Sequence, residues 1–109
     1  MKKNLLLFLL VGFFHFSPLA AQTGIYINEV MGSNKNTIAD STGSFEDWLE
    51  LFNSNSSIKL LNGYYITNDI TQPKLFRLSG NLQIPAHGYL ILWASNDTTR
   101  GKTHLPFKI

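Results

Sequence analysis

Apolar positions along this 109-residue chain fall, after residue 21, into short runs separated by clusters of Asn, Gly, Ser and Pro. No stretch there keeps the 3.6-residue apolar period of an amphipathic helix over three turns, and within most runs apolar and polar residues alternate. Alternation between turn-forming clusters predicts β-strands. The expected strands are Ile25–Val30, Trp48–Phe52, Tyr64–Thr67, Leu75–Leu78, Leu82–Ile84 and Tyr89–Trp93, with a final apolar patch at Leu105–Ile109. Short strands at this spacing are typical of an all-β sandwich or barrel.

The alternation also assigns side chains to the two faces of each strand, because successive residues of a strand point in opposite directions. The side chains expected to meet in one interior are Leu49, Leu51, Tyr64, Ile66, Phe76, Leu78, Leu82 and Ile84. Those expected to point outward from the same strands are Trp48, Glu50, Phe52, Tyr65, Thr67, Arg77 and Gln83. Residues 89–93 are apolar on both faces, which predicts a central strand covered on both sides.

The first 21 residues have the three-part pattern of a secretory signal peptide. A positive head (Met1–Asn4) precedes a nearly unbroken apolar run (Leu5–Phe16) and a small-residue segment that ends at Ala21. The apolar run is about 12 residues long, whereas a bilayer-spanning helix needs about 20, so an uncleaved anchor is the weaker interpretation. We therefore expect a signal-peptide helix over residues 1–21 and one mature domain over residues 22–109. That domain is expected to be secreted or otherwise extracytoplasmic, in the periplasm, on the cell surface or in the medium.

The amino-acid composition excludes some kinds of site and partner for residues 22–109. The chain has no cysteine, which excludes a disulfide framework, a thiol nucleophile and a Cys-ligated metal site. Two of the basic residues, Lys2 and Lys3, lie in the signal segment, so the remainder holds seven basic and seven acidic residues. Nucleic acids reward clustered Lys and Arg through counterion release, and a chain with balanced charge is therefore not expected to bind them.

Five segments, taken in order, resemble the lamin tail domain, and in particular the branch of that family found in secreted bacterial proteins. These segments are Ile27–Val30, Asp47–Asn53, Leu61–Thr67, Ile84–Ala94 and Phe107–Ile109. Any one of them alone is a weak signal, but five in the same order with plausible gaps form a strong one. The resemblance extends over Gly24–Ile109, which is essentially the whole mature chain.

This resemblance implies an immunoglobulin-like β-sandwich and a non-catalytic role. Bacterial relatives accompany extracellular nucleases, phosphatases or spore-coat-kinase-like proteins as accessory domains. In the family the chain continues past the segment that matches Phe107–Ile109 into closing strands, so the resemblance implies a C-terminally truncated sandwich with one strand position vacant. We expect an interaction or tethering module with a protein or surface polysaccharide as partner, no cofactor, and no membrane span after signal cleavage.

Acidic residues offer one weak candidate metal site. Asp40, Glu46 and Asp47 flank a Gly-containing, oxygen-rich stretch, and Ca²⁺ prefers six to eight oxygen ligands. Their spacing does not match an EF-hand, and a solvated hairpin loop accounts for the same residues. For Asp47, local hydrogen bonding that fixes the loop between the first two strands is the simpler role. A metal-assisted hydrolase built on Glu29, Asp47 and Glu50 is a further interpretation, but no convergent base and nucleophile supports it.

The two histidines of the mature chain have no catalytic spacing. His87 lies in the turn Pro85–Gly88, where a solvated polar residue is expected, and His104 lies in the loop Ser95–Leu105. Neither stands in a Ser/His/Asp order or a His-x-x-x-His pattern. No catalytic residue is therefore assigned, and an enzyme is not expected.

Three aromatic residues form the candidate binding site. If the alternation holds, Trp48, Phe52 and Tyr65 all leave the core and form a stripe on one outer face. Such a stripe would stack on sugar rings or anchor a protein partner, because aromatic anchors dominate interface energetics. A small carbohydrate-binding or adhesion domain is therefore the alternative function. The competing interpretation is that these rings make cross-strand pairs or lie beneath the loop Asn34–Ser44.

Overall fold

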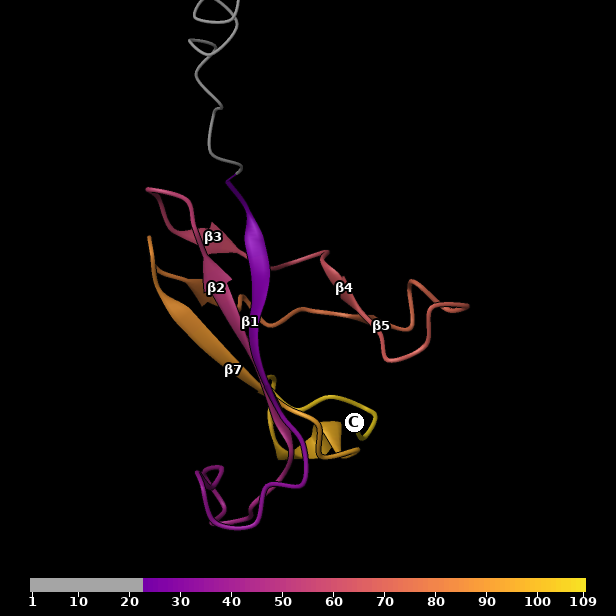
Figure 1. The fold of residues 1–109 in the computed structure, drawn as a ribbon. Coiled ribbons are helices and arrows are strands. Elements are labelled where there is room, and N and C mark those ends of the chain that lie inside the picture. The colour runs from indigo at the N-terminus through magenta and orange to yellow at the C-terminus, as the bar shows by residue number, and fades with distance from the viewer. Residues whose placement is uncertain (1–22) are drawn as a thin grey trace, which may run out of the picture.

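The computed structural model describes residues 23–109, and the predicted signal peptide at residues 1–21 lies outside the described residues. The described part of the chain is all-β, with small antiparallel sheets and one short 3₁₀ helix (Figure 1). Its elements are β1 (Ile25–Met31), β2 (Trp48–Asn53), β3 (Lys59–Leu60), β4 (Tyr65–Ile66), β5 (Phe76–Arg77), β6 (Gln83–Ile84), β7 (Tyr89–Trp93) and η1 (Thr98–Arg100). Between residues 23 and 109 there is no helix of the length and apolarity needed to cross a membrane.

The largest sheet has three antiparallel strands in the order β1-β2-β7. β2 lies in the middle, with β1 on one side and β7 on the other. A β-bulge shifts the β1–β2 register between Ile27, which lies opposite Leu51, and Glu29. Because a bulge adds one residue to its strand, Val30 rather than Glu29 falls opposite Leu49 and shares its face. The bulge therefore keeps β1 apolar on the side that faces the interior.

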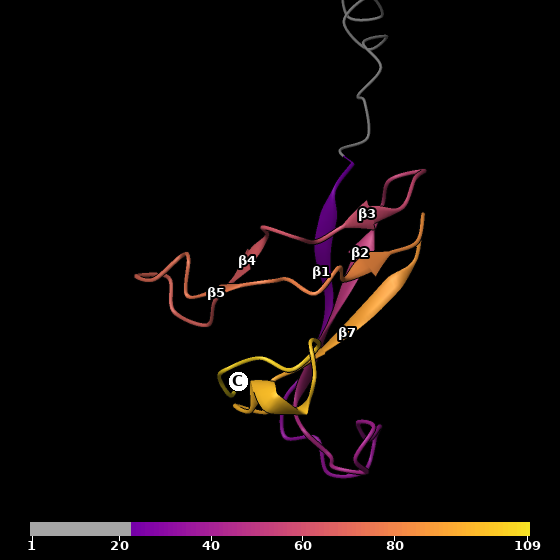
Figure 2. The same cartoon turned by 180° about the vertical axis from the view of Figure 1, so that it is seen from behind.

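One hydrophobic core joins this sheet to the rest of the described chain. Two further antiparallel pairs, β3–β6 and β4–β5, complete the strands. The core cluster consists of Leu49, Leu51, Leu61, Leu78, Leu82, Ile84, Leu92, Leu105 and Phe107. Figures 1 and 2 show β3 and β6 against the β2–β7 part of the sheet, whereas β4 and β5 project on the side of β1. The second set of strands thus covers the sheet unevenly.

The predicted strand positions are largely confirmed. Each of the six predicted runs contains an observed strand, and β7 has the predicted bounds. β3 (Lys59–Leu60) was not predicted. The prediction that residues 89–93 form a central strand is wrong, since β7 lies at an edge of its sheet. Its second apolar face has another cause: the Tyr89 ring packs on Phe52 of β2, with ring centroids 4.9 Å apart.

The predicted interior is confirmed for most of its members. Leu49, Leu51, Leu78, Leu82 and Ile84 are buried, while Ile66 and Phe76 are half-buried and pack against the core. Tyr64 is the exception, with 43% of its surface exposed. It follows a tight turn in which its N–H donates to Leu61 O (3.0 Å), and Gly63 adopts φ 86° at the position of that turn which favours glycine. The turn carries the Tyr64 side chain to the rim of the core.

Candidate functional site

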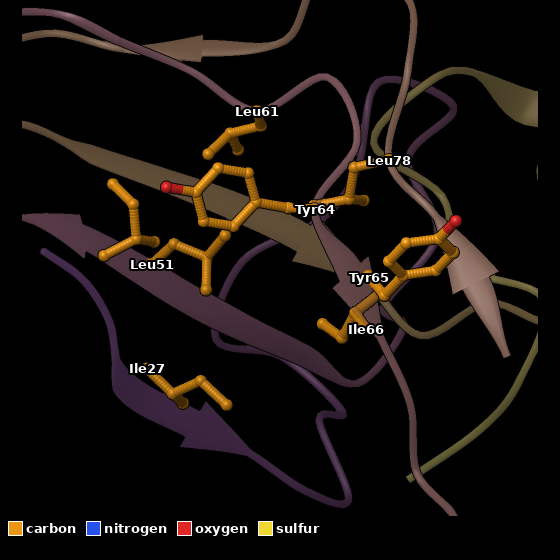
Figure 3. A pocket seen from close by; sticks show the side chains of 8 residues that line it. Ile27, Leu51, Leu61, Tyr64, Tyr65, Ile66 and Leu78 are labelled. Atoms are coloured by element: carbon orange, nitrogen blue, oxygen red, sulfur yellow. The ribbon is translucent and has the colours of Figure 1, made fainter. Parts of the chain in front are cut away.

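An apolar groove opens between the inner face of β1 and β2 and the segment that runs from Leu61 to β4. The residues that line it are Ile25, Ile27, Leu51, Leu61, Tyr64, Tyr65, Ile66 and Leu78. Figure 3 shows the Tyr64 ring beside Leu51 and Leu61, while Ile27 on β1 and Ile66 on β4 lie on opposite sides of the opening. Its volume is about 160 Å³. Ligand pockets for small molecules usually measure about 300–1,000 Å³, so this groove fits one or two side chains better than a cofactor.

On the inner face of the sheet, the apolar side chains of β2 are covered, whereas those of β1 are exposed. Ile27 lies directly opposite Leu51, and Val30 directly opposite Leu49, so each pair points to the same side of the sheet. Leu51 and Leu49 are both 5% exposed, whereas Ile27 is 61% and Val30 58% exposed. Two apolar side chains thus point toward the interior and remain in water. Alternation in the sequence predicts the face to which these side chains point, but it does not predict whether another strand covers that face.

The backbone of β1 has a free edge on the side away from β2. Ser54 N–H donates to Gly24 O (3.0 Å), which places that pair at a hydrogen-bonded position of the antiparallel ladder. Because such positions alternate along a strand, the backbone groups of Ile25 and Ile27 point away from β2. No strand within residues 23–109 pairs with β1 on that side. The outer edge of β7, by contrast, is partly covered by residues 103–105.

Two cations lie beside Tyr65, whose ring points away from the groove (Figure 3). The Lys74 ammonium lies 5.8 Å from the centre of the Tyr65 ring. Arg77 lies opposite Tyr65 in the β4–β5 pair, and its guanidinium is 3.5 Å from the position that a Cβ on Gly63 would take. Among the described residues neither cation has a carboxylate within salt-bridge distance. The outward face of β4 and β5 therefore carries two positive charges that form no salt bridge among the described residues.

The acidic residues proposed as calcium ligands meet cations of the chain itself. Arg100 extends one nitrogen to Asp40 and the other to Glu46 Oε1 (2.7 Å). Lys108 Nζ lies 2.6 Å from the second Glu46 oxygen. Asp47 is turned elsewhere and accepts the Asn34 N–H at 2.7 Å, as predicted for a residue that fixes this loop. Within residues 23–109 no group of three or more His, Asp or Glu side chains is placed to hold a metal ion.

Hydrogen bonds and nearby cations favour the ionised form of the two acids. Burial acts to raise the pKa of Asp40, but hydrogen bonds from Thr42 and Ser44 and the charge of Arg100 outweigh it, so the pKa lies below its ordinary value. Hydrogen bonds from Lys108 and Arg100 likewise lower the pKa of Glu46. The cluster ties the C-terminal segment to the loop between β1 and β2, which is a structural role.

The two histidines differ in environment. His87 is exposed in its turn, as predicted. His104 is buried, with Nδ1 2.8 Å from Ser95 Oγ and Nε2 3.8 Å from Asp40 Oδ2. Sequence spacing did not predict this Ser/His/Asp proximity, which arises because the loop after β7 folds back beside Trp93. All three side chains are buried and none of them lines the groove, so the arrangement gives a substrate no access to the serine.

The predicted aromatic stripe does not form. Trp48 is only 4% exposed, so the prediction that it leaves the core is wrong; it stands between Met31 and Trp93 of the neighbouring strands. Tyr65 is exposed, but it lies on β4, in a different sheet from Phe52, next to the face of β2 that carries Leu51. Phe52 instead makes the cross-strand pair with Tyr89 described above.

The groove and the free edge of β1 form the candidate site. Comparisons of the chain with protein-family models, with curated proteins and with solved structures give no match. Residues of the site that sequence reasoning missed are Ile27 and Val30 as exposed apolar groups. Their hydrophobicity was visible in the sequence, but their exposure depends on which strands lack a neighbour.

Proposed function

We propose that this chain is a non-catalytic, secreted interaction module of lamin-tail type with an immunoglobulin-like sandwich, which tethers or recruits a protein through the groove beside β1. The observation that carries the proposal is the contrast between Ile27, 61% exposed, and its cross-strand neighbour Leu51, 5% exposed. An apolar side chain that points inward and stays in water marks a surface that a partner completes.

The chemistry of the groove supports a macromolecular partner over a small substrate. Six of the eight residues that line it are Ile or Leu and the other two are tyrosines, and its volume of about 160 Å³ accepts side chains. The acidic residues Asp40, Glu46 and Asp47 are occupied by hydrogen bonds and ion pairs within the fold. The groove and the edge of β1 are not occupied by contacts among the described residues, so they are available to bind a partner in a tethering role.

A carbohydrate-binding or adhesion role is the second candidate, favoured by one observation on the opposite face of the sheet. Tyr26, Phe52 and Tyr89 lie directly opposite one another across β1, β2 and β7, so their rings share the outer face. Tyr26 and Tyr89 are 40% and 56% exposed. Binding to a glycan array that Tyr89→Ala abolishes and Tyr64→Ala leaves intact would favour this candidate over the first.

A peptide-display selection tests the leading proposal. A random peptide library is panned on the mature chain, with counter-selection on Ile27→Lys. Ile27 is exposed, so this variant is expected to fold, which circular dichroism checks first. We expect binders that lose affinity for Ile27→Lys but keep it for Ile70→Lys, since Ile70 is an equally apolar residue, 93% exposed, outside the groove. Binders that ignore Ile27, or a selection without binders, would overturn the proposal.

A further inference from the structure

The outward face of the β4–β5 pair presents an exposed aromatic ring beside two cations. Tyr65 and Arg77 lie directly opposite each other in this pair, so their side chains share one face. The Lys74 ammonium lies 5.8 Å from the centre of the Tyr65 ring, and 45% of the Tyr65 surface is exposed. Figure 3 shows this ring turned away from the groove. The outward face of β4 and β5 is therefore a second surface, separate from the candidate site.

Charge on this surface is not balanced within the described chain. Among residues 23–109, Lys74 and Arg77 form no salt bridge, whereas two other cations each pair with a carboxylate. The three-stranded sheet has the opposite charge, because Glu29 and Glu50 lie directly opposite each other across β1 and β2 and neither has a cation within salt-bridge distance. An anionic ligand is therefore attracted to the β4–β5 pair and repelled by the sheet.

The position of this pair favours a polymer over a small anion. Both views show β4 and β5 projecting from the rest of the described chain (Figures 1 and 2). A ligand on a projecting surface is contacted from one side only, whereas small-molecule sites enclose most of their ligand. A polymer that reaches several such groups at once adds weak contacts together. In a chain of acidic sugars, the apolar side of a sugar ring packs on an aromatic ring, and the carboxylates pair with Arg and Lys.

We propose that the outward face of β4 and β5 binds an acidic polysaccharide, with a sugar ring stacked on Tyr65 and carboxylates paired with Lys74 and Arg77. This inference goes beyond the proposed function, which uses the groove. It supplies the second attachment that a tether needs, since the groove would hold a protein while the β4–β5 pair holds a polymer. An acidic peptide offers the charge without the sugar ring, and nucleic acids are disfavoured by the equal numbers of basic and acidic residues in the mature chain.

A panel of labelled polymers tests the partner class. Pectate, alginate and hyaluronate are the acidic polysaccharides, and their binding to the mature chain is followed by fluorescence anisotropy. We expect at least one of them to bind, and sodium chloride to weaken that binding because the contacts are exposed. Methyl-esterified pectin keeps the sugar ring without the charge and should bind at least about threefold more weakly than pectate. Absence of binding to all three, or equal binding of polyglutamate or single-stranded DNA, would overturn the proposal.

Substitutions locate the polysaccharide on the protein. Lys74→Gln, Arg77→Gln and Tyr65→Leu should each weaken binding about threefold or more. Arg77→Lys keeps the charge but loses the planar fork, so its affinity should lie between those of the wild type and Arg77→Gln. Lys35→Gln is the matched control, because Lys35 is an exposed cation without a salt bridge in the loop between β1 and β2. Circular dichroism checks that each variant folds, and wild-type affinity in all three weakened variants would overturn the site.

Two further variants separate this inference from the functions proposed above. Ile27→Lys alters the groove and Tyr89→Ala alters the outer face of the three-stranded sheet, so both should keep wild-type affinity for the polysaccharide. Binding that Tyr89→Ala abolishes and Arg77→Gln leaves intact would overturn this inference and favour the second candidate function. If no polysaccharide binds while selected peptides still depend on Ile27, this inference is overturned and the proposed function stands.

Discussion

The exposure of Ile27 makes a quantitative prediction about the stability of the isolated chain. Complete burial of an Ile or Leu side chain contributes about 1.5–3 kcal/mol. Ile27 keeps 61% of its surface in water. Its burial therefore contributes only roughly two fifths of the full value, and truncation to alanine can remove at most about 0.6–1.2 kcal/mol. Leu51 is 5% exposed within the core, where Leu→Ala costs about 2–5 kcal/mol because a cavity remains.

Guanidinium unfolding of Ile27→Ala and Leu51→Ala, followed by tryptophan fluorescence, measures the two costs. Both substitutions end in alanine on paired strands, so the loss of strand propensity is similar in the two and the difference reports burial. We expect Leu51→Ala to cost at least about 1 kcal/mol more than Ile27→Ala. Should Leu51→Ala fail to fold, Leu51→Val serves as a milder truncation.

Equal costs would refute the reasoning, because they would mean that Ile27 is covered in the free chain. The same conclusion would follow if Ile27→Ala cost more than about 2 kcal/mol. Sedimentation at each protein concentration is the necessary control, since self-association would supply the missing cover. Val30→Ala and Leu49→Ala repeat the comparison at the second matched pair.

Three further predictions concern the ion cluster and one turn. The pKa values of Asp40 and Glu46 are lowered in the folded state, so the stability they contribute is present above their ordinary values and is lost as the pH falls through the lowered ones. Urea midpoints should therefore drop most steeply below about pH 4, and Asp40→Asn should flatten that drop; a flat wild-type profile would contradict this. Arg100→Lys keeps the charge but loses the fork that reaches both acids, and its thermal midpoint should fall by several degrees, whereas an unchanged midpoint would show that one nitrogen suffices. Gly63→Ala should cost about 1–2 kcal/mol in denaturant because of its positive φ, while Gly32→Ala, whose Cβ would meet no atom within 4 Å, should be close to neutral.

The alternation of apolar and polar residues was sufficient to predict the two strands β2 and β7, which pair with each other along their length. β2 and β7 were located to within a residue because Leu49 and Leu51 alternate with polar or aromatic neighbours and turn clusters bound the runs. The direction of Ile27 also follows from alternation. Its exposure does not, because it depends on how far the second set of strands extends over β1.

Long-range features of the site were beyond the same reasoning. Arg100 meets Asp40 across 60 residues and Lys108 meets Glu46 across 62, and no spacing rule connects such positions. Trp48 was predicted to leave the core, yet it is buried between neighbours on both adjacent strands, which alternation alone does not reveal. The acids were therefore recognised as a cluster, while the cations that occupy them were not.

The late position of Arg100, Leu105 and Phe107 in the chain has a consequence for how the fold is reached. Leu105 and Phe107 belong to the core, and Arg100 neutralises a carboxylate 60 residues earlier. At about 5–20 residues per second, ribosomal synthesis delivers these partners roughly 3–12 s after the loop that waits for them. Throughout that interval β1 and β2 lack two members of their core and the counter-charge of Arg100. Folding is thus expected to be a single late event with high contact order, and the nascent chain a natural client for holding chaperones.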